Sequence, residues 1–409
     1  MYRSLTPFLC LLSALLAGCL SAPPNVEAES GPIPELTKVH STSLFSGGIG
    51  FLALSEDGST FIAGNEYSGV GLYRTSDYAP LERHYDCEGE ALTTPDGAYS
   101  CNKRANICDL GYIDANTWYF TNRENGGGPT IIRVYVRTIH PPRETFVSTV
   151  NEITNEATAS VNKNYIAYNN ELIDWHTGKR YPVKTPAFDP YSWIVPTLTP
   201  DNRIITYPNG KTVIFDPLND TMEFWKEAIP LDGTIVMPDN RHAIGISTAN
   251  YKCTLWSWPE RKKIGHCSER LGWTFGRYSE YRERLALSSD GKFFAVGFDH
   301  TVRVYRIEPF KLELEVTTPG PVGKLALSDD GWLATYDREG FLRVWNVATG
   351  KLAGQQRNIS SHDIYSFKLM FQPGSGGRLF TTYNSMTVFE IPKQSAQQKT
   401  KSTSKTQKE

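Results

Sequence analysis

This sequence of 409 residues lacks most of the motifs that identify an enzyme, a metal protein or a nucleic-acid-binding protein. It contains no GxSxG, no HExxH, no Gly-Lys-Ser/Thr phosphate loop and no EF-hand loop. The 42 basic and 44 acidic residues give a formal net charge of −2, so no surface for nucleic acid is indicated. The eight histidines are scattered singly along the chain. We therefore expect no catalytic residues, no metal, no cofactor and no nucleic-acid partner.

Long apolar runs are also missing, and the longest one stands at the N-terminus. Residues 5–16 follow the single positive charge of Arg3 and are too few for the roughly 20 residues that span a bilayer. A short basic start, an apolar middle and small residues at the end are typical of an export signal. Leu16-Ala17-Gly18-Cys19 then resembles the lipobox of bacterial lipoproteins. An ordinary signal peptide with an incidental cysteine is the alternative.

The lipobox resemblance implies that residues 1–18 are removed and that the thiol of Cys19 carries lipid, such as palmitate. Leu20 then favours the periplasmic face of the outer membrane, with the inner membrane and the cell surface as alternatives. Residues 19–36 are polar and Pro-rich, so they read as an extended linker to a body over residues 37–392. Residues 393–409 are polar and basic, and we expect a disordered tail or a tether for an anionic partner.

Cysteine is scarce, and five of the seven cysteines remain in the exported body. Disulfides persist in an oxidising compartment. Pro259-Glu260-Arg261 reads as the loop of a β-hairpin, and pairing Trp258 with Lys262 places Cys253 opposite Cys267, within bonding range. Cys101 and Cys108 form a second expected bridge, with Cys87 left over. The alternatives are a zinc site of His84, Cys87, Cys101 and Cys108, whose spacing fits no zinc motif, and five buried thiols.

An internal repeat indicates the fold class. Three segments share apolar–polar alternation followed by Asp-Gly: residues 51–58, 284–291 and 324–331. Alternation with period two predicts a half-buried strand, and Asp-Gly predicts a tight turn into a second strand. Weaker copies of the turn bring the number of units to eight, with markers at Asp57, Asp96, Lys163, Asp201, Asp239, Asp290, Asp330 and Gly376.

Most intervals between these markers lie near the roughly 40 to 45 residues of a four-stranded propeller blade. The interval from Asp96 to Lys163 is far longer, so we expect either an insertion around residues 101–142 or another blade. Residues 342–351, with Trp345-Asn346 in place of Trp-Asp, resemble the end of a WD40 repeat. Residues 302–306, 172–179 and 212–216 are similar. The resemblance implies an all-β, WD40-like β-propeller, with eight blades preferred over seven and a sandwich as the other all-β alternative.

Propellers usually close by mixing strands from both ends of the chain in one blade. We expect residues 35–44 to supply the outer strand of the last blade, beside strands at 366–371, 378–383 and 386–391. Ser55-Glu56-Asp57-Gly58 only partly matches the boxes of sialidase propellers, and we interpret it as a turn.

Because the sequence carries no enzyme or metal-site motif, we infer its function from the predicted propeller fold. We expect a membrane-tethered scaffold or assembly factor of the cell envelope that binds unidentified envelope proteins through propeller faces. The sequence leaves enzymatic activity undecided and favours its absence. The alternatives are an envelope hydrolase or lactonase-type enzyme, and a glycan or ligand binder. Aromatic and arginine side chains dominate interface hot spots. Our candidate contacts are Trp193, Tyr278, Tyr281 and Arg282.

Overall fold

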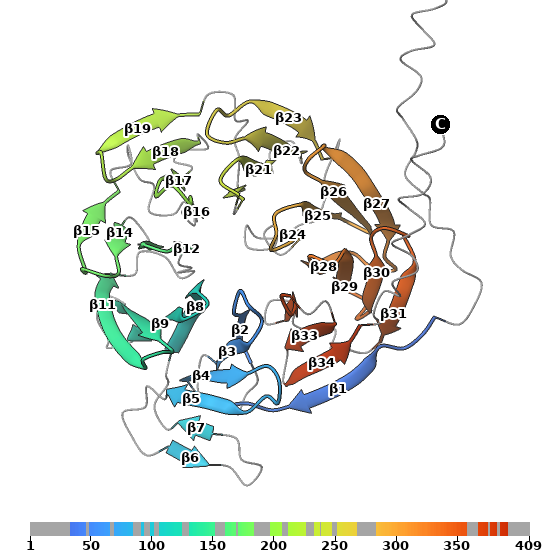
Figure 1. The fold of residues 1–409 in the computed structure, drawn as a ribbon, viewed down its shortest axis with the longest axis horizontal. Coiled ribbons are helices and arrows are strands. Elements are labelled where there is room, and N and C mark those ends of the chain that lie inside the picture. Colours follow the sequence, from blue (N-terminus) through green and yellow to red (C-terminus); the bar gives the residue numbers. More distant parts are fainter. Residues whose placement is uncertain are drawn as a thin grey trace, which may run out of the picture.

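Eight four-stranded antiparallel sheets stand around a central axis and form a closed ring (Figure 1). The computed structural model contains no helix among the residues it describes, and so no described helix that could cross a membrane. The described residues are 33–45, 49–65, 69–84, 91–93, 99–101, 106–124, 131–151, 160–168, 171–183, 197–206, 212–225, 233–237, 239–247, 252–267, 284–357, 367–374, 377–382 and 385–391. The prediction of an eight-bladed, all-β propeller is confirmed.

The blades are numbered along the chain, and the strands of each blade are given in order from the axis outward. Blade 1 consists of β2 (Phe51–Leu54), β3 (Thr60–Asn65), β4 (Gly69–Arg74) and β5 (Pro80–His84). Blade 2 consists of β8 (Asn106–Asp114), β9 (Thr117–Glu124), β10 (Ile131–Thr138) and β11 (Arg143–Asn151). Blade 3 consists of β12 (Ser160–Val161), β13 (Tyr165–Tyr168), β14 (Glu171–Asp174) and β15 (Arg180–Pro182). Blade 4 consists of β16 (Thr197–Leu198), β17 (Ile204–Thr206), β18 (Val213–Asp216) and β19 (Thr221–Phe224).

The second half of the ring follows the same plan. Blade 5 consists of β20 (Gly233–Val236), β21 (His242–Ser247), β22 (Lys252–Ser257) and β23 (Lys263–His266). Blade 6 consists of β24 (Leu285–Leu287), β25 (Phe293–Phe298), β26 (Thr301–Arg306) and β27 (Lys311–Thr317). Blade 7 consists of β28 (Val322–Leu327), β29 (Trp332–Asp337), β30 (Leu342–Asn346) and β31 (Leu352–Gln356). Blade 8 consists of β32 (Lys368–Phe371), β33 (Arg378–Thr382), β34 (Met386–Glu390) and β1 (Thr37–Thr42).

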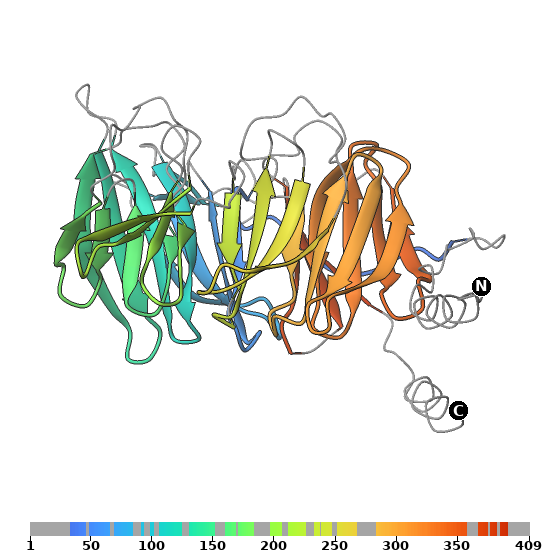
Figure 2. The same ribbon diagram turned by 90° about the horizontal axis from the view of Figure 1, so that it is seen from above.

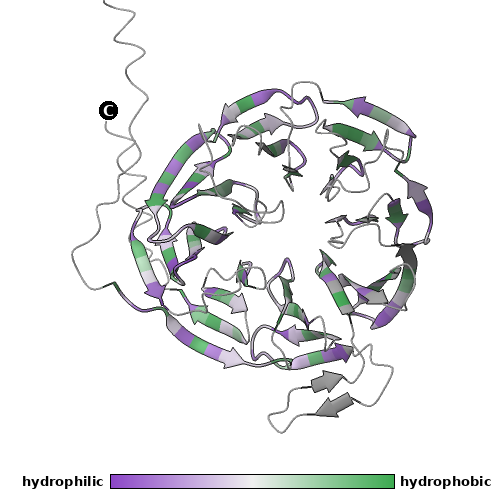
Figure 3. Ribbon diagram, turned by 180° about the vertical axis from the view of Figure 1, so that it is seen from behind, coloured by the Kyte–Doolittle hydropathy of each residue, from purple (hydrophilic) through white to green (hydrophobic). Residues whose placement is uncertain are grey.

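The turns of each blade divide the ring into two faces. Because neighbouring strands are antiparallel, the turn after the first strand and the turn after the third strand lie on one face (Figure 2). We call this the turn face. Apolar and polar residues alternate along the strands (Figure 3), and the apolar ones pack between adjacent blades in clusters such as Ile62, Leu72 and Leu110 of blades 1 and 2. The core is therefore a ring of inter-blade layers.

The repeated Ser-x-Asp-Gly segment is a structural clamp at the turn face. In blade 1 the Ser55 hydroxyl donates to Asp57 Oδ1 at 2.6 Å, and it accepts from the Thr60 amide at 3.0 Å. Ser288 and Asp290 repeat the same contact in blade 6, at 2.8 Å. Gly58 and Gly291 each adopt a φ of 68°, which favours glycine. The hydroxyl thus replaces a ladder bond across the turn, which supports the interpretation of Ser55–Gly58 as a turn.

Blade 8 closes the ring with strands from both ends of the chain, as predicted. Strand β1 pairs with β34 from Thr37↔Glu390 to Thr42↔Met386. Next to the seam, the His40 ring stacks on Tyr78 of blade 1, with 3.9 Å between ring centroids. Gln372 Nε2 of blade 8 donates to Gly58 O of blade 1 at 2.7 Å. Blade 8 is therefore joined to blade 1 by both aromatic and polar contacts.

The expected second unit is placed differently in the structure. Strands β6 (Ala91–Thr93) and β7 (Tyr99–Cys101), on either side of the Asp96 marker, form a separate two-stranded hairpin outside the ring (Figure 1). Of the two alternatives for the long interval, an insertion around residues 101–142 or another blade, the structure shows another blade, because these residues contain most of blade 2. The first turn of blade 2 reads Asp114-Ala115-Asn116 and carries no Asp-Gly, so the marker missed it. One false unit and one missed blade left the count at eight.

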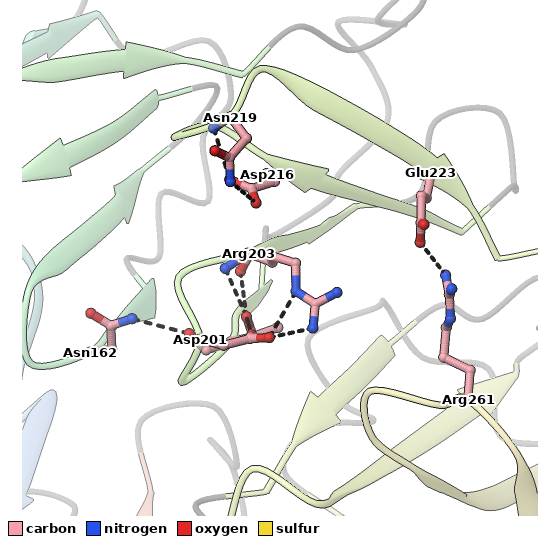
Figure 4. A network of polar contacts seen from close by, with 8 residues as sticks. Asn162, Asp201, Arg203, Asp216, Asn219, Glu223 and Arg261 are labelled. Carbon is pink, nitrogen blue, oxygen red and sulfur yellow. Dashed lines mark hydrogen bonds and ion pairs between the residues drawn. The ribbon is translucent and has the colours of Figure 1, made fainter.

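Polar contacts between side chains also link neighbouring blades. Arg261 of blade 5 pairs with Glu223 of blade 4 at 2.6 Å, and Asn162 of blade 3 donates to Asn202 of blade 4 at 2.9 Å (Figure 4). Arg137 of blade 2 pairs with Glu82 of blade 1 at 2.7 Å. Each contact joins consecutive blades, so these contacts add polar links to the apolar layers between the blades.

Candidate axial site

A cavity of about 680 Å³ opens along the axis on the turn face. Blades 1, 2, 3, 6, 7 and 8 contribute to it through the ends of their innermost strands and the turns that follow. We call it the axial cavity. Its floor is apolar because the innermost strands end in apolar residues that also pack between blades. Floor residues include Leu54, Ile113, Val161, Ala286, Leu327 and Phe371.

The rim of the axial cavity carries charge of one sign. Four carboxylates line it, and no lysine, arginine or histidine is among the described residues of its lining. The four are Glu56, Asp114, Asp329 and Asp330. With uniform sign over an apolar floor, the cavity fits an extended ligand that has an apolar group and cationic side chains.

The repeated turn explains how these carboxylates reach the rim. In the Ser-x-Asp-Gly segment, serine and aspartate clamp the turn and the residue at position x lines the cavity, as do the clamp residues Ser288, Ser328 and Asp330. Glu56, Ser289 and Asp329 occupy this position in blades 1, 6 and 7, and all three line the cavity. Sequence reasoning missed this site because it took the repeat as evidence of fold only. The position x of the aligned repeats is the signal that could have revealed it.

Hydrogen bonds hold two of the rim carboxylates in place. Asp329 Oδ1 accepts from the Asp290 amide of the neighbouring blade at 2.9 Å, and its other oxygen accepts from the Ser289 hydroxyl. Asp114 Oδ1 accepts from the Asn116 amide at 2.8 Å. Fixed carboxylates lose little conformational freedom on meeting a cation, so the rim is organised before a ligand arrives.

Ionisation in and near the cavity follows from burial and hydrogen bonding. Burial raises the pKa of Tyr112, although the hydrogen bond with Thr60, 2.8 Å long, acts in the opposite sense. Its phenol therefore stays neutral at physiological pH. Burial of Asp290 favours the protonated form, but hydrogen bonds from Lys292 and Ser288 outweigh this and lower the pKa of its carboxyl. The wall of the cavity thus includes a neutral phenol, and the ionised carboxyl of Asp290 lies beside the wall in the adjoining turn of blade 6.

The disulfide expected from sequence is present in the structure. Cys253 and Cys267 are bonded, with 5.1 Å between their Cα atoms, and both are fully buried. The assumed pairing of Trp258 with Lys262 is wrong. A bulge between Leu255 and Trp256 shifts the register by one residue, so the Ser257 amide donates to Lys262 O. The register beyond the bulge still places the two cysteines opposite one another.

The other predicted site residues are not brought together by the described structure. Cys101 lies in the β6–β7 hairpin and Cys108 in the first strand of blade 2, and the positions of their side chains are not described. Their bridge stays a prediction. Cys19, Trp193, Tyr278, Tyr281 and Arg282 lie outside the described residues, as does Cys87. Within the described part of the chain, no group of three or more His, Cys, Asp or Glu residues is placed to hold a metal ion.

A second exposed surface lies on the outer strand of blade 4, away from the axial cavity. All four residues of β19 are exposed, including Met222 at 40% and Phe224 at 48%, and Leu218 in the preceding turn is 41% exposed. The outer strand of blade 6, in contrast, presents Glu313 and Glu315, which are ion-paired to arginines. Exposed apolar side chains gathered on one strand are a feature of contact surfaces.

Comparisons with known proteins agree with the fold. No protein-family model matches this chain. WD repeat-containing protein 55 of Danio rerio is 32% identical over 81 residues, which are 19% of this chain and 21% of the relative. The match thus spans about a fifth of that relative's length. At this coverage it indicates related repeats and carries no statement about the whole protein.

Solved structures match over most of the chain at low identity. Sqt1 of Saccharomyces cerevisiae superposes with a TM-score of 0.60 at 10% identity, over 88% of this chain and all of that one. Sqt1 of Chaetomium thermophilum, bound to the N-terminus of the ribosomal protein L10, superposes with a TM-score of 0.56 at 13% identity, over 87% of this chain and all of that one. The computationally designed Ika8 protein superposes with a TM-score of 0.56 at 15% identity, over 88% of this chain and all of that one. With the ring of eight sheets, these likenesses show that the chain folds as a WD40-like β-propeller.

Proposed function

We propose that this protein is a membrane-tethered scaffold of the cell envelope that holds a partner protein at its axial cavity. The observation that carries the proposal is the apolar floor surrounded by four carboxylates. The chemistry fits an extended partner segment that places an apolar side chain on the floor and lysine or arginine side chains against the rim. The C. thermophilum Sqt1 structure, with a bound protein N-terminus, supports the use of this fold for peptide capture.

The binding test uses a synthetic probe of matching chemistry. A fluorescein-labelled peptide of alternating lysine and leucine is titrated with the full chain, and its anisotropy is measured. We expect binding that weakens with salt, and no binding of the matching glutamate–leucine peptide. Ser289→Arg, which adds a cation to the rim, should weaken binding at least about tenfold, since mismatched charge at an interface costs more than 1 kcal/mol.

The matched control is Glu223→Gln, which removes a carboxylate from the outer strand of blade 4 and should leave the affinity unchanged. Equal affinity of the wild type and Ser289→Arg, or binding of both peptides alike, would refute the axial cavity as the binding site. Circular dichroism of each variant should show the same β-sheet spectrum, so that a loss of binding is assigned to the site.

The tether is the second part of the proposal. Lipid on Cys19 and the linker that follows it, up to residues 34–36 on the edge of blade 7, would hold the propeller at the periplasmic face of the outer membrane. Cys19→Ser should abolish membrane fractionation and leave a folded body. Growth with a radioactive fatty acid should label the wild type but not the variant. A wild-type chain that takes up no label, or that fractionates as a soluble periplasmic protein, would remove the lipid anchor from the proposal.

A further inference from the structure

The chain leaves the propeller beside the axial cavity. Strand β34 runs toward the turn face and ends at Glu390, and the next amide, that of Ile391, donates to Gly377 O at 2.8 Å. Gly377 follows the first turn of blade 8, in which Gly374 lines the cavity only three residues earlier. Ile391 is fully buried, so the exit point is fixed. Whatever follows residue 391 therefore begins close to the lip of the cavity.

The segment that follows has the charge that the rim lacks. Residues 393–409 contain five lysines and one glutamate, whereas the described lining of the cavity holds four carboxylates and no lysine, arginine or histidine. The nearby cation Lys292 is paired with Asp290 at 2.7 Å and also acts on Asp329, so the lining keeps an excess of negative charge. At about 3.3 Å per residue, the chain from Ile391 to Lys399 can span roughly 26 Å, and the later lysines reach further. The lysines can therefore meet the rim without any change in the ring.

From this exit point and charge complementarity we propose that residues 393–409 fold back over the axial cavity and compete with the partner segment for its carboxylates. The inference rests on the proposed function of the cavity. A short connection gives a tethered segment an effective concentration in the millimolar range, so even weak binding keeps the rim occupied. Opposite charges at the rim supply the attraction, and salt screens it.

The composition of the segment also explains how a partner displaces it. Its single apolar side chain is Ala396, so it can pair with the rim but cannot fill the apolar floor. A partner that brings a large apolar side chain gains the burial that the tail lacks. The tail then acts as a low-affinity occupant that blocks weak cationic ligands and yields to a complete one.

The test uses a fluorescein-labelled synthetic peptide of residues 393–409 as probe and the full chain as receptor. One variant replaces Lys393, Lys399, Lys401, Lys405 and Lys408 with glutamine, and a matched control replaces the same lysines with arginine. The glutamine variant should bind the probe about tenfold more tightly than the wild type, because its own competitor is gone. The arginine control should behave as the wild type does. The difference between the glutamine variant and the wild type should shrink at high salt.

A second set of variants locates the binding. In the glutamine variant, Glu56→Gln with Asp329→Asn should weaken probe binding, whereas Glu223→Gln on the outer strand of blade 4 should not. Equal affinity of the wild type and the glutamine variant would overturn the proposal. So would probe binding that ignores Glu56 and Asp329, or a probe that binds phosphatidylglycerol vesicles but not the protein. If the lysine–leucine peptide binds at the cavity while the tail probe does not, only this inference fails. If neither peptide binds, the proposed function fails too.

Discussion

A contact between Leu36 and Gly354 gives a sharp test of how the start of the chain is attached to the ring. Residues 34–36 extend the outer edge of blade 7: the Leu36 amide donates to Gln355 O at 3.1 Å, and the Gln355 amide donates to Pro34 O at 2.9 Å. The Leu36 side chain is 5% exposed and packs into the core between blades 7 and 8. A Cβ on Gly354 would lie 2.8 Å from Leu36 Cδ2. Gly354 is therefore required by the leucine that passes over it.

The expected magnitudes follow from this geometry. Leu36→Ala removes a buried side chain and should cost about 2 to 3 kcal/mol of unfolding free energy, because a cavity remains. Gly354→Ala forces the leucine to move and should cost about 1 to 2 kcal/mol. In the double variant the close Cδ2 atom is absent, so the second substitution should cost only a few tenths of a kcal/mol, the Pro34 oxygen lying 3.3 Å from the added Cβ. The coupling should thus be about 1 kcal/mol, stabilising.

Urea unfolding of the wild type, both single variants and the double variant, followed by tryptophan fluorescence, measures this coupling. Equal slopes across the four proteins allow their midpoints to be compared as free energies. Simple addition of the two single costs would show that Leu36 does not pack on Gly354, and a single Gly354→Ala variant as stable as the wild type would show the same. Either result would refute the packed attachment of residues 34–36 to blade 7.

Three further predictions rest on single contacts. Reducing the Cys253–Cys267 bond, which closes a separation of 14 residues, should lower stability by up to about 3 kcal/mol; urea unfolding with and without reductant measures this, and the Cys253→Ala, Cys267→Ala double variant should respond less to reductant than the wild type by that amount. Burial lowers the pKa of His40 below its ordinary 6.5, so its contribution to stability is full above pH 6.5 and is lost as pH falls through the lowered value; His40→Phe should flatten the thermal-melting profile between pH 7 and pH 5, and an unchanged profile would contradict this. Ser288→Ala removes the hydroxyl that bonds Asp290 and the Phe293 amide, and should cost about 1 to 2 kcal/mol in a urea melt; an unfolding midpoint equal to that of the wild type would show that the clamp contributes nothing.

Local sequence was enough to predict much of this fold. Alternation followed by Asp-Gly predicted the first two strands of blades 1, 6 and 7, because a tight turn at a fixed place sets the register of both strands. The closing strand was also predictable, since a ring that closes must pair the two ends of its body. Blade 2 was misread because its first turn has no Asp-Gly and because the β6–β7 hairpin outside the ring imitates the signal.

The candidate site was beyond the reach of the sequence for a physical reason. Glu56 and Asp114 lie on blades 1 and 2, whereas Asp329 and Asp330 lie on blade 7, far along the chain, and only ring closure brings the four around one opening. The bulge in blade 5 was equally hidden, because one extra residue in a strand leaves no mark in a local pattern. The sequence by itself predicted the strands and turns of most blades, since these depend on contacts between near neighbours, whereas its count of eight combined one false unit with one missed blade. Only the tertiary structure decided which of the turn residues share a cavity, because that depends on how eight separate sheets pack around the axis.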